Sequence, residues 1–221
     1  MKIDKIKLLG FTEEIFLKLF SSQYSKEKAF ISKCFQIEVE SQFDNVKLRL
    51  HLIDALYSTQ MSKRYYGIEE LAETLAQYSD DKLIEEAYKY INNENSEILD
   101  KVFTEKYGYN SIGKKEKKAV SLISKYLYFL TDYQFPIYDS LVKIAYPKVM
   151  KEYNLKTGYT KITDINFVQA LSALNQLSGI NDFEKLDNFL WYSQKVENNS
   201  FSLICSKEEH LKKIALNNSS K

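Results

Sequence analysis

The chain has 221 residues, of which only six are glycine and two are proline. A β-sandwich, a β-barrel or a series of βαβ units of this length needs more turn residues, so the composition excludes these folds and predicts long helices. The net charge of +1 excludes an overall basic protein, so any contact with nucleic acid has to come from local clusters of Lys and Arg.

The cysteines and the hydropathy of the chain argue against metal sites and membrane-spanning segments. Cys34 and Cys205 are far apart, and with two histidines they cannot supply a four-cysteine iron–sulfur cluster or a local zinc site. No apolar run reaches the ~18 residues that a bilayer-spanning helix needs. The N-terminal segment also lacks the apolar core of a signal peptide. We therefore expect a cytoplasmic protein with no membrane association, no metal and no cofactor.

Hydrophobic periodicity predicts a series of helices in the first half of the chain. They cover residues 11–20, 45–60 (ending near Ser58), 67–78, 80–91 and 97–107, with 26–35 as a further helix or an irregular piece. Asp80 or Asp81 is expected to cap the fourth of these helices. Residues 36–43 alternate between apolar and polar side chains, which is a weak strand signal, and a loop or a helix fits equally well.

The second half continues in the same way after a glycine-containing turn at 108–113. Helices are predicted over 114–130, 140–146, 147–154, 164–178 and 182–196, with an irregular aromatic loop at 131–140 and a helix with a flexible tail (about 215–221) at the C-terminal end. The chain has neither an internal repeat nor a persuasive linker. We expect one compact all-α domain over residues 1–221.

One predicted helix, 114–130, carries a narrow polar stripe on an otherwise apolar surface. Lys118, Ser121, Lys125 and Tyr128 follow one another at positions i, i+3, i+7 and i+10, which places them on one face. This face either contacts solvent or lines a polar cavity inside the molecule. A lysine partly withdrawn from water in such a cavity has a lowered pKa and becomes a usable nucleophile.

Asp139 follows this helix and the loop stiffened by Pro136. It stands immediately before the predicted helix at 140–146, so it is either a helix cap or a carboxylate that faces the cavity. In the second case Asp139 serves as a base or as the electrostatic stabiliser of a cation. The segment at about 108–140 is thus the candidate site.

Several short motifs resemble the helix-hairpin-helix (HhH-GPD) DNA glycosylases, which are base-excision enzymes. The motifs are Leu-Tyr-Ser-Thr-Gln-Met (56–61), Asn-Ser-Ile-Gly-Lys-Lys (110–115), the Lys118–Lys125 helix and Phe-Pro-Ile-Tyr-Asp-Ser (135–140). The last motif and Leu-Asp-Asn-Phe-Leu-Trp (186–191) are also similar to bacterial proteins with an 8-oxoguanine glycosylase fold, some of which belong to antiviral defence loci.

The resemblance implies an all-α glycosylase fold and a set of catalytic roles. Lys118 is the implied nucleophile on the sugar C1′, Lys125 is its neighbour or substitute, and Asp139 is the base or stabiliser. The hairpin departs from the family because Ser111 occupies the place of the second glycine. Lys114 and Lys115 lie too far from Asp139 in the sequence for the usual spacing. The nucleophile is therefore expected among the later lysines, and the choice between Lys118 and Lys125 stays open.

DNA, duplex or single-stranded, is the implied partner. The implied DNA contacts are Gln60, Lys63, Arg64, Gly113, Lys114 and Lys115, and the implied base pocket contains Tyr128, Tyr138 and Trp191. Lysines at the expected start of the 114–130 helix, with its free amides, suit a phosphate; alternatively they are a solubilising surface. Two other functions stay open: a catalytically inactive module that binds nucleic acid or a protein partner, and a purely structural or interaction module.

Overall fold

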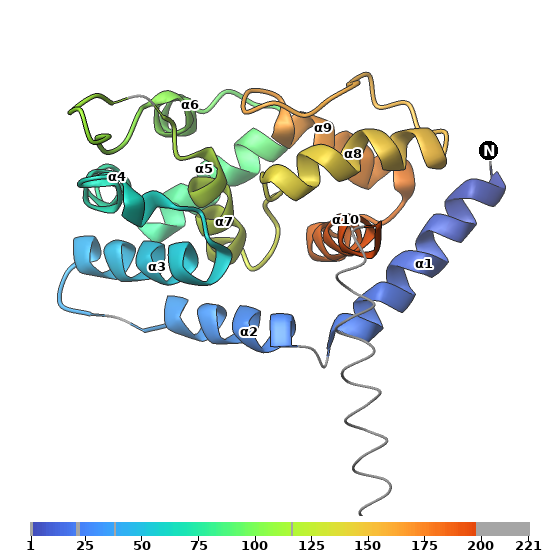
Figure 1. Ribbon diagram of the computed structural model, residues 1–221, viewed down its shortest axis with the longest axis horizontal. Coiled ribbons are helices and arrows are strands. Elements are labelled where there is room, and N and C mark those ends of the chain that lie inside the picture. Colours follow the sequence, from blue (N-terminus) through green and yellow to red (C-terminus); the bar gives the residue numbers. More distant parts are fainter. Residues whose placement is uncertain (1, 21–22, 38, 116, 198–221) are drawn as a thin grey trace, which may run out of the picture.

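The computed structural model of the chain describes residues 2–20, 23–37, 39–115 and 117–197. Within these residues the secondary structure is helical apart from two isolated β-bridges, which confirms the all-α prediction (Figure 1). The elements are α1 (Lys2–Phe20), α2 (Gln23–Phe35), α3 (Gln42–Tyr57), the 3-10 helix η1 (Met61–Lys63), α4 (Gly67–Leu75), α5 (Asp80–Ile91), α6 (Glu97–Thr104), α7 (Val120–Leu130), α8 (Ser140–Glu152), α9 (Phe167–Ser178) and α10 (Phe183–Glu197).

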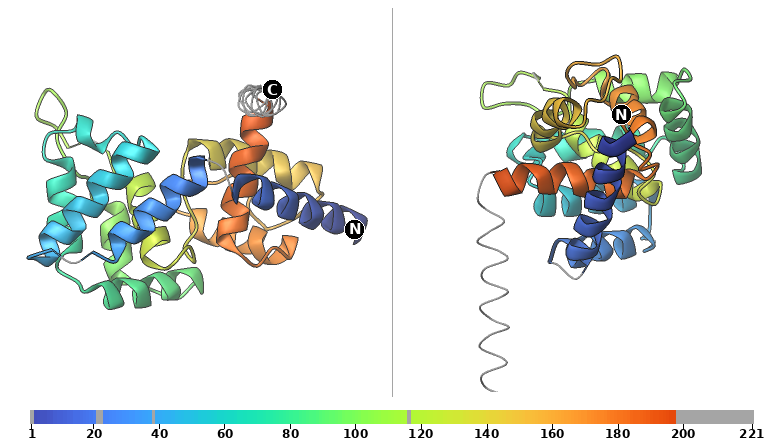
Figure 2. Two further views of the ribbon diagram at one scale, coloured as in Figure 1. Left: turned by 90° about the horizontal axis from the view of Figure 1, so that it is seen from below. Right: turned by 90° about the vertical axis from the view of Figure 1, so that its right-hand side faces the viewer.

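The helices lie in two neighbouring groups. Helices α2 to α7 form one group, and α1 packs with α8, α9 and α10 in the other (Figures 1 and 2). The N-terminal helix α1 therefore lies against α10, far away in the sequence, and α10 in turn packs on α8. Buried side chains from both groups form one continuous hydrophobic core.

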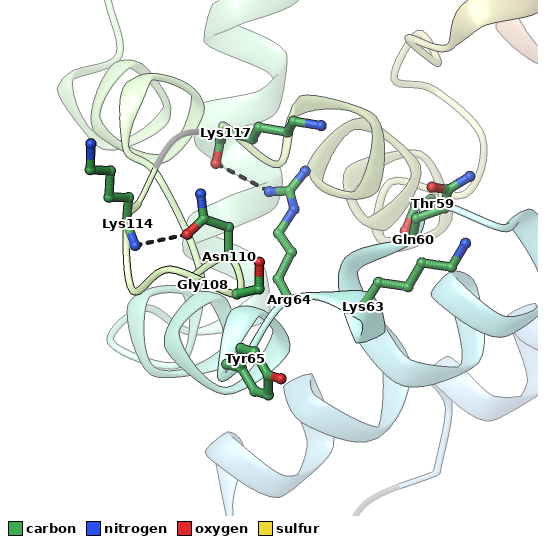
Figure 3. A pocket seen from close by; sticks show the side chains of 10 residues that line it. Thr59, Gln60, Lys63, Arg64, Tyr65, Gly108, Asn110, Lys114 and Lys117 are labelled. Carbon is green, nitrogen blue, oxygen red and sulfur yellow. Dashed lines mark hydrogen bonds between the residues drawn. The ribbon is translucent and has the colours of Figure 1, made fainter.

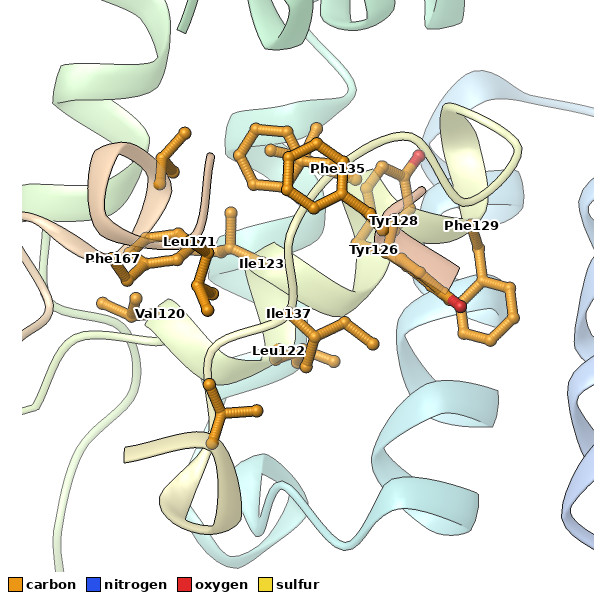
Figure 4. Packing of buried hydrophobic residues seen from close by; sticks show 14 of the residues in the cluster. Val120, Leu122, Ile123, Tyr126, Tyr128, Phe129, Phe135, Ile137, Phe167 and Leu171 are labelled. Atoms are coloured by element: carbon orange, nitrogen blue, oxygen red, sulfur yellow. The ribbon is translucent and has the colours of Figure 1, made fainter. Parts of the chain in front are cut away.

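Helix α7 is the centre of this core. It packs against α2, α3, α5 and α6, and its residues 120 and 122–129 are all buried. Figure 4 shows its apolar side chains among those of the following loop and of α9. An apolar helix that is covered on most sides is expected at the centre of a helical domain. Any polar side chain on α7 is therefore held in a defined place.

The loop between α7 and α8 is fixed by aromatic packing and by one serine. Phe135 packs against Phe103 of α6 and Phe167 of α9, with ring centroids 6.3 Å and 6.2 Å away. The hydroxyl of Ser124 on α7 accepts a hydrogen bond from the Tyr138 amide at 3.0 Å. These contacts determine where the next residue, Asp139, is placed.

Serine and aspartate caps begin five of the described helices, among them α10, where the Asp182 side chain accepts a hydrogen bond from the Lys185 amide at 3.0 Å. The side chains of Ser41, Ser79 and Ser96 accept hydrogen bonds from amides in the first turns of α3, α5 and α6, and Asp139 does the same for α8. The expected cap at Asp80 or Asp81 is one residue off, because Ser79 holds that position. Side-chain oxygens at these positions satisfy amides that have no partner within the helix.

Some predicted elements differ from the structure. The helix expected from Lys114 begins only at Val120. For 36–43, where strand, loop and helix were all open, the described residues form a loop up to Ser41, and Gln42 and Phe43 begin α3. The two helices expected at 140–154 are the single helix α8, which continues through Pro147. Pro147 and Lys143, whose carbonyl loses its partner, are both exposed, so water replaces the missing hydrogen bond.

Two further findings concern the ends and the hydropathy of the chain. The predicted helix and flexible tail at 205–221, with Cys205, lie outside the described residues. In the described part of the chain, none of the helices combines the length and the apolar character needed to cross a bilayer.

Candidate active site and basic groove

The structure pairs Lys125 with Asp139. Lys125 lies in the middle of α7, and its Nζ is 3.6 Å from the Asp139 Oδ2 and donates a hydrogen bond of 2.9 Å to the Ser121 Oγ. The second carboxylate oxygen of Asp139 caps α8, accepting a hydrogen bond from the Val142 amide at 2.9 Å. Asp139 therefore has both of the roles that the sequence left open: it caps α8 and it contacts a lysine of the preceding helix.

Burial sets the electrostatics of this pair. The Lys125 side chain is only 3% exposed, whereas 23% of the Asp139 side chain is exposed. Burial lowers the pKa of the Lys125 ammonium, and the attraction of Asp139 and Asp187 offsets this only in part. A neutral amine at this position is a stronger nucleophile than an ammonium in water.

A cavity of about 370 Å³, with Asp139 in its wall, is lined by residues from both groups of helices. Its walls contain side chains from α2, α3, α8 and α10 and from the loop before α8. They include three carboxylates and two aromatic rings: Glu27, Asp139, Asp187, Tyr57 and Trp191. The Lys125 Nζ also lies over the Tyr57 ring, 5.7 Å from its centroid. The cavity therefore combines carboxylates and aromatic rings with the aliphatic side chains of Leu56, Ile137 and Leu141, and Asp139 in its wall contacts the buried Lys125.

Lys118 does not share the stripe that the sequence predicts. It lies before α7, in an extended segment that forms a bridge with Lys106, and its Nζ pairs with the Asp164 Oδ2 at 2.9 Å. The prediction of one helical face through Lys118 and Lys125 is wrong because α7 begins at Val120. Of the two candidate lysines, the structure brings Lys125 next to Asp139.

The three residues predicted to form a base pocket have different surroundings. Trp191 lines the cavity. Tyr128 is fully buried, with its ring against Tyr133, so it offers no face to a base in this conformation. Tyr138 is half-buried, and its ring packs on Phe167 with the centroids 5.1 Å apart.

A second hollow, of about 610 Å³, unites the two predicted basic clusters (Figure 3). We call it the basic groove. Among the described residues that line it, four are basic and none is acidic: Lys63, Arg64, Lys114 and Lys117. The predicted contact Gln60 lines it too. The Arg64 guanidinium donates to the Lys117 carbonyl at 3.1 Å and so joins two segments that are far apart in the sequence.

The hairpin at 105–119 forms one wall of the basic groove. Asn110 closes its tip, because its backbone carbonyl accepts from the Gly113 amide and its side chain accepts from the Lys114 amide, both at 3.0 Å. The expected turn is thus present, but the described residues between it and Val120 are not helical, so the lysines there lie on the hairpin and not at a helix start. Lys115 pairs with Glu70 at 2.8 Å and lies over the Tyr109 ring.

A turn at residues 58–62 joins the cavity to the basic groove, since residues 56–58 line the cavity and residues from Thr59 onward line the basic groove. Asp54 holds this turn. Its carboxylate accepts hydrogen bonds from the Thr59 hydroxyl and from the amides of Met61 and Ser62, the last two at 2.8 Å and 2.9 Å. Gln60 has a left-handed backbone with φ of 63°, which costs free energy and persists only where the surroundings enforce it.

We expect Asp54→Ala to destabilise the protein by about 2–4 kcal/mol at pH 7, because two backbone amides lose their acceptor. Burial opposes ionisation of Asp54, but its hydrogen bonds outweigh burial and lower its pKa. A depressed pKa stabilises the fold above the unfolded-state pKa, and this contribution is lost as the pH falls through the folded-state pKa. Urea unfolding should therefore show a smaller difference between variant and wild type at pH 3 than at pH 7. An equal difference would contradict the assignment.

The lowered pKa of Lys125 also predicts a stability that rises with pH, but in the alkaline range. Because the folded protein binds this proton more weakly than the unfolded chain, the unfavourable contribution of the charged amine decreases as the pH rises toward the ordinary lysine value. Relative to Lys125→Met, the wild type should gain stability as the pH rises from 7 toward the ordinary lysine pKa. Lys118→Met, at a lysine that is partly exposed, serves as the control. Parallel stability curves for wild type and Lys125→Met would contradict this prediction.

Several residues of both sites were missed in the sequence. Asp187 and Tyr57 stand within the motifs at 186–191 and 56–61, which were their available signals, whereas Glu27 had none. Asp54 was hidden inside the predicted helix at 45–60. Lys117 belongs to the lysine-rich segment after the turn at 108–113. Its partner Arg64 is 53 residues away in the chain, so only the fold brings the two together.

The described residues contain no group of three or more His, Cys, Asp or Glu side chains placed to hold a metal ion. Comparisons of the chain with protein-family models, curated proteins and solved structures gave no significant match.

Proposed function

We propose that the protein is a DNA glycosylase-like enzyme that removes a base from DNA, with Lys125 as the nucleophile and Asp139 as the base. The observation that supports this most strongly is the contact between a buried lysine of lowered pKa and a carboxylate on the wall of a cavity. A perturbed amine beside a carboxylate is typical of a site for covalent catalysis. DNA repair or antiphage defence in the cytoplasm is the setting that the family resemblance implies.

The reaction uses only groups of this site. Asp139 takes a proton from the Lys125 ammonium, and the neutral amine attacks C1′ of the deoxyribose while the bond from C1′ to the base breaks. The base leaves with the bonding electrons and takes up the proton that Asp139 holds. The bond from C1′ to O4′ then breaks and O4′ takes one of the two protons on Nζ, which leaves a protonated Schiff base between Nζ and C1′. Once the base has taken its proton, the Asp139 carboxylate stabilises the positive charge on Nζ.

The cavity and the basic groove divide the recognition of DNA between them. A volume of about 370 Å³ is at the lower end of small-ligand sites, which span ~300–1,000 Å³. Trp191 and Tyr57 offer aromatic surfaces to a flipped base. The four cations of the basic groove suit the phosphates of the same strand, since the turn at 58–62 connects the two hollows.

Borohydride trapping tests this function. Purified protein is incubated with duplex and single-stranded oligonucleotides that carry 8-oxoguanine, uracil or an abasic site, and borohydride reduces any Schiff base to a stable adduct. We expect an adduct with the wild type and with Lys118→Met, and none with Lys125→Met. If the adduct were lost only in Lys118→Met, Lys118 and not Lys125 would be the nucleophile.

A wild-type protein that binds these oligonucleotides without forming an adduct or releasing a base would contradict excision of these lesions. It would favour the alternative of a catalytically inactive module that binds nucleic acid. Circular dichroism of both variants establishes that a lost adduct reflects a lost nucleophile and not a lost fold.

A further inference from the structure

Two adjacent tyrosines, Tyr65 and Tyr66, are exposed beside the basic groove. Their exposed fractions are 64% and 68%, whereas Tyr107, Tyr126 and Tyr146 are almost completely buried. A tyrosine normally contributes its large apolar ring to a core or an interface. Two neighbouring exposed rings therefore form a surface that the fold itself does not use.

The backbone presents these rings in a fixed way. Tyr65 and Tyr109 exchange two backbone hydrogen bonds, at 3.1 Å and 2.9 Å. Tyr66 has a left-handed backbone with φ of 60°, which is rare for a bulky residue and is imposed here by the turn before α4. Rigid aromatic side chains lose little conformational entropy when they bind a partner, which favours recognition.

Cations and hollows surround the two rings. Tyr65 lines the basic groove, and Figure 3 shows it on one side of Arg64 with Lys63 nearby. Tyr65 and Tyr66 both line a third hollow, of about 410 Å³, which also contains Lys63, His51 and one carboxylate, Glu69. The rings thus lie between two hollows that share Lys63 and Arg64.

We infer that Tyr65 and Tyr66 stack on the bases of an unpaired DNA strand whose phosphates lie in the basic groove. Aromatic rings interleaved with cations bind single strands because every base offers a π-face, and in a duplex neighbouring base pairs cover these faces. A hollow of about 610 Å³ holds a short stretch of one strand. This inference rests on the proposed use of the basic groove for DNA, and it specifies single-stranded DNA as the substrate class. An unpaired strand also lowers the cost of turning a base into the cavity.

Fluorescence anisotropy with a short labelled oligothymidylate, and with the same strand in a duplex, tests the inference. We expect the double variant Tyr65→Leu/Tyr66→Leu to bind the single strand at least tenfold more weakly, since stacking contributes ~1–3 kcal/mol for each base and ~1.4 kcal/mol corresponds to tenfold. The variant Tyr65→Phe/Tyr66→Phe should bind within about twofold of the wild type, because the π-faces remain. Tyr88→Leu, which changes an exposed tyrosine of α5, should leave binding unchanged.

Unchanged binding by the double Leu variant, or an equal loss for single strand and duplex, would overturn the inference. The same experiments show separately whether the stacking by the tyrosines or the proposed base excision has failed. A protein that binds the single strand through the tyrosines but forms no borohydride adduct refutes the chemistry alone. A wild type that binds neither form of DNA refutes the use of the basic groove and this inference together.

Discussion

Asp139→Asn is expected to slow base release by about 10²–10⁴-fold under single-turnover conditions, the usual contribution of a positioned proton acceptor. Asn is as good a helix cap as Asp, so α8 should keep its hydrogen bond to the Val142 amide and the fold should not change. What the variant loses is the negative charge 3.6 Å from the Lys125 Nζ. The loss should therefore appear in the chemical step, with little change in the affinity for DNA.

Asp164→Asn is the matched control for this experiment. It makes the same chemical change in the other lysine–aspartate pair, where the Asp164 Oδ2 lies 2.9 Å from the Lys118 Nζ. We expect it to excise at the wild-type rate. If Asp139→Asn excised within a few-fold of the wild type on a substrate that the wild type cleaves, Asp139 would be only a cap and its proposed role as a base would be refuted.

Gly108→Ala is expected to destabilise the protein by about 2–5 kcal/mol. Gly108 has φ of 71°, and a Cβ there would lie 2.7 Å from the Gly67 Cα and 2.9 Å from the Arg64 Cβ. Left-handed strain costs about 1–2 kcal/mol, and overlap in a packed contact adds about 1–3 kcal/mol. Because this contact docks the hairpin at 105–119 against the start of α4, the variant should also bind DNA more weakly.

Gly113→Ala separates the two contributions to this loss. Gly113 lies in the same hairpin with φ of 73°, but no atom within 4 Å would meet its Cβ. We expect only the cost of the left-handed backbone, about 1–2 kcal/mol, in urea unfolding. Equal losses in the two alanine variants would show that the close approach of Gly108 to Gly67 is unimportant.

The sequence predicts those parts of the fold that depend on local signals. The helix ending near Ser58 and the one starting at Gly67 were predicted within a few residues, because the periodicity of their apolar side chains and their ends are local. The segment 114–119 was misassigned as helix because its partners are distant. Its Lys117 carbonyl accepts from the Tyr107 amide, and Lys118 forms a bridge with Lys106. Such pairing leaves no periodic pattern in the segment itself.

The candidate site follows the same division between local and distant signals. Asp139 as the cap of α8 could be predicted from its place before a helix, and Lys125 from its place in an apolar run. That Lys125 and not Lys118 meets Asp139 depends on where α7 begins, which the hairpin determines. Asp187 reaches the cavity because α10 packs on α8, a contact between elements that have no common local signal.

The packing of α1 against α10 affects the order of events during synthesis on the ribosome. Asp187 and Trp191 are on α10, so one wall of the cavity is absent until almost all of the described chain has been translated. Helices α2 to α7 contact one another and can pack earlier, with the basic groove among them. Under the proposed function, a nascent chain would be able to hold a strand before it could cut a glycosidic bond, and catalysis would begin only when α10 has been made.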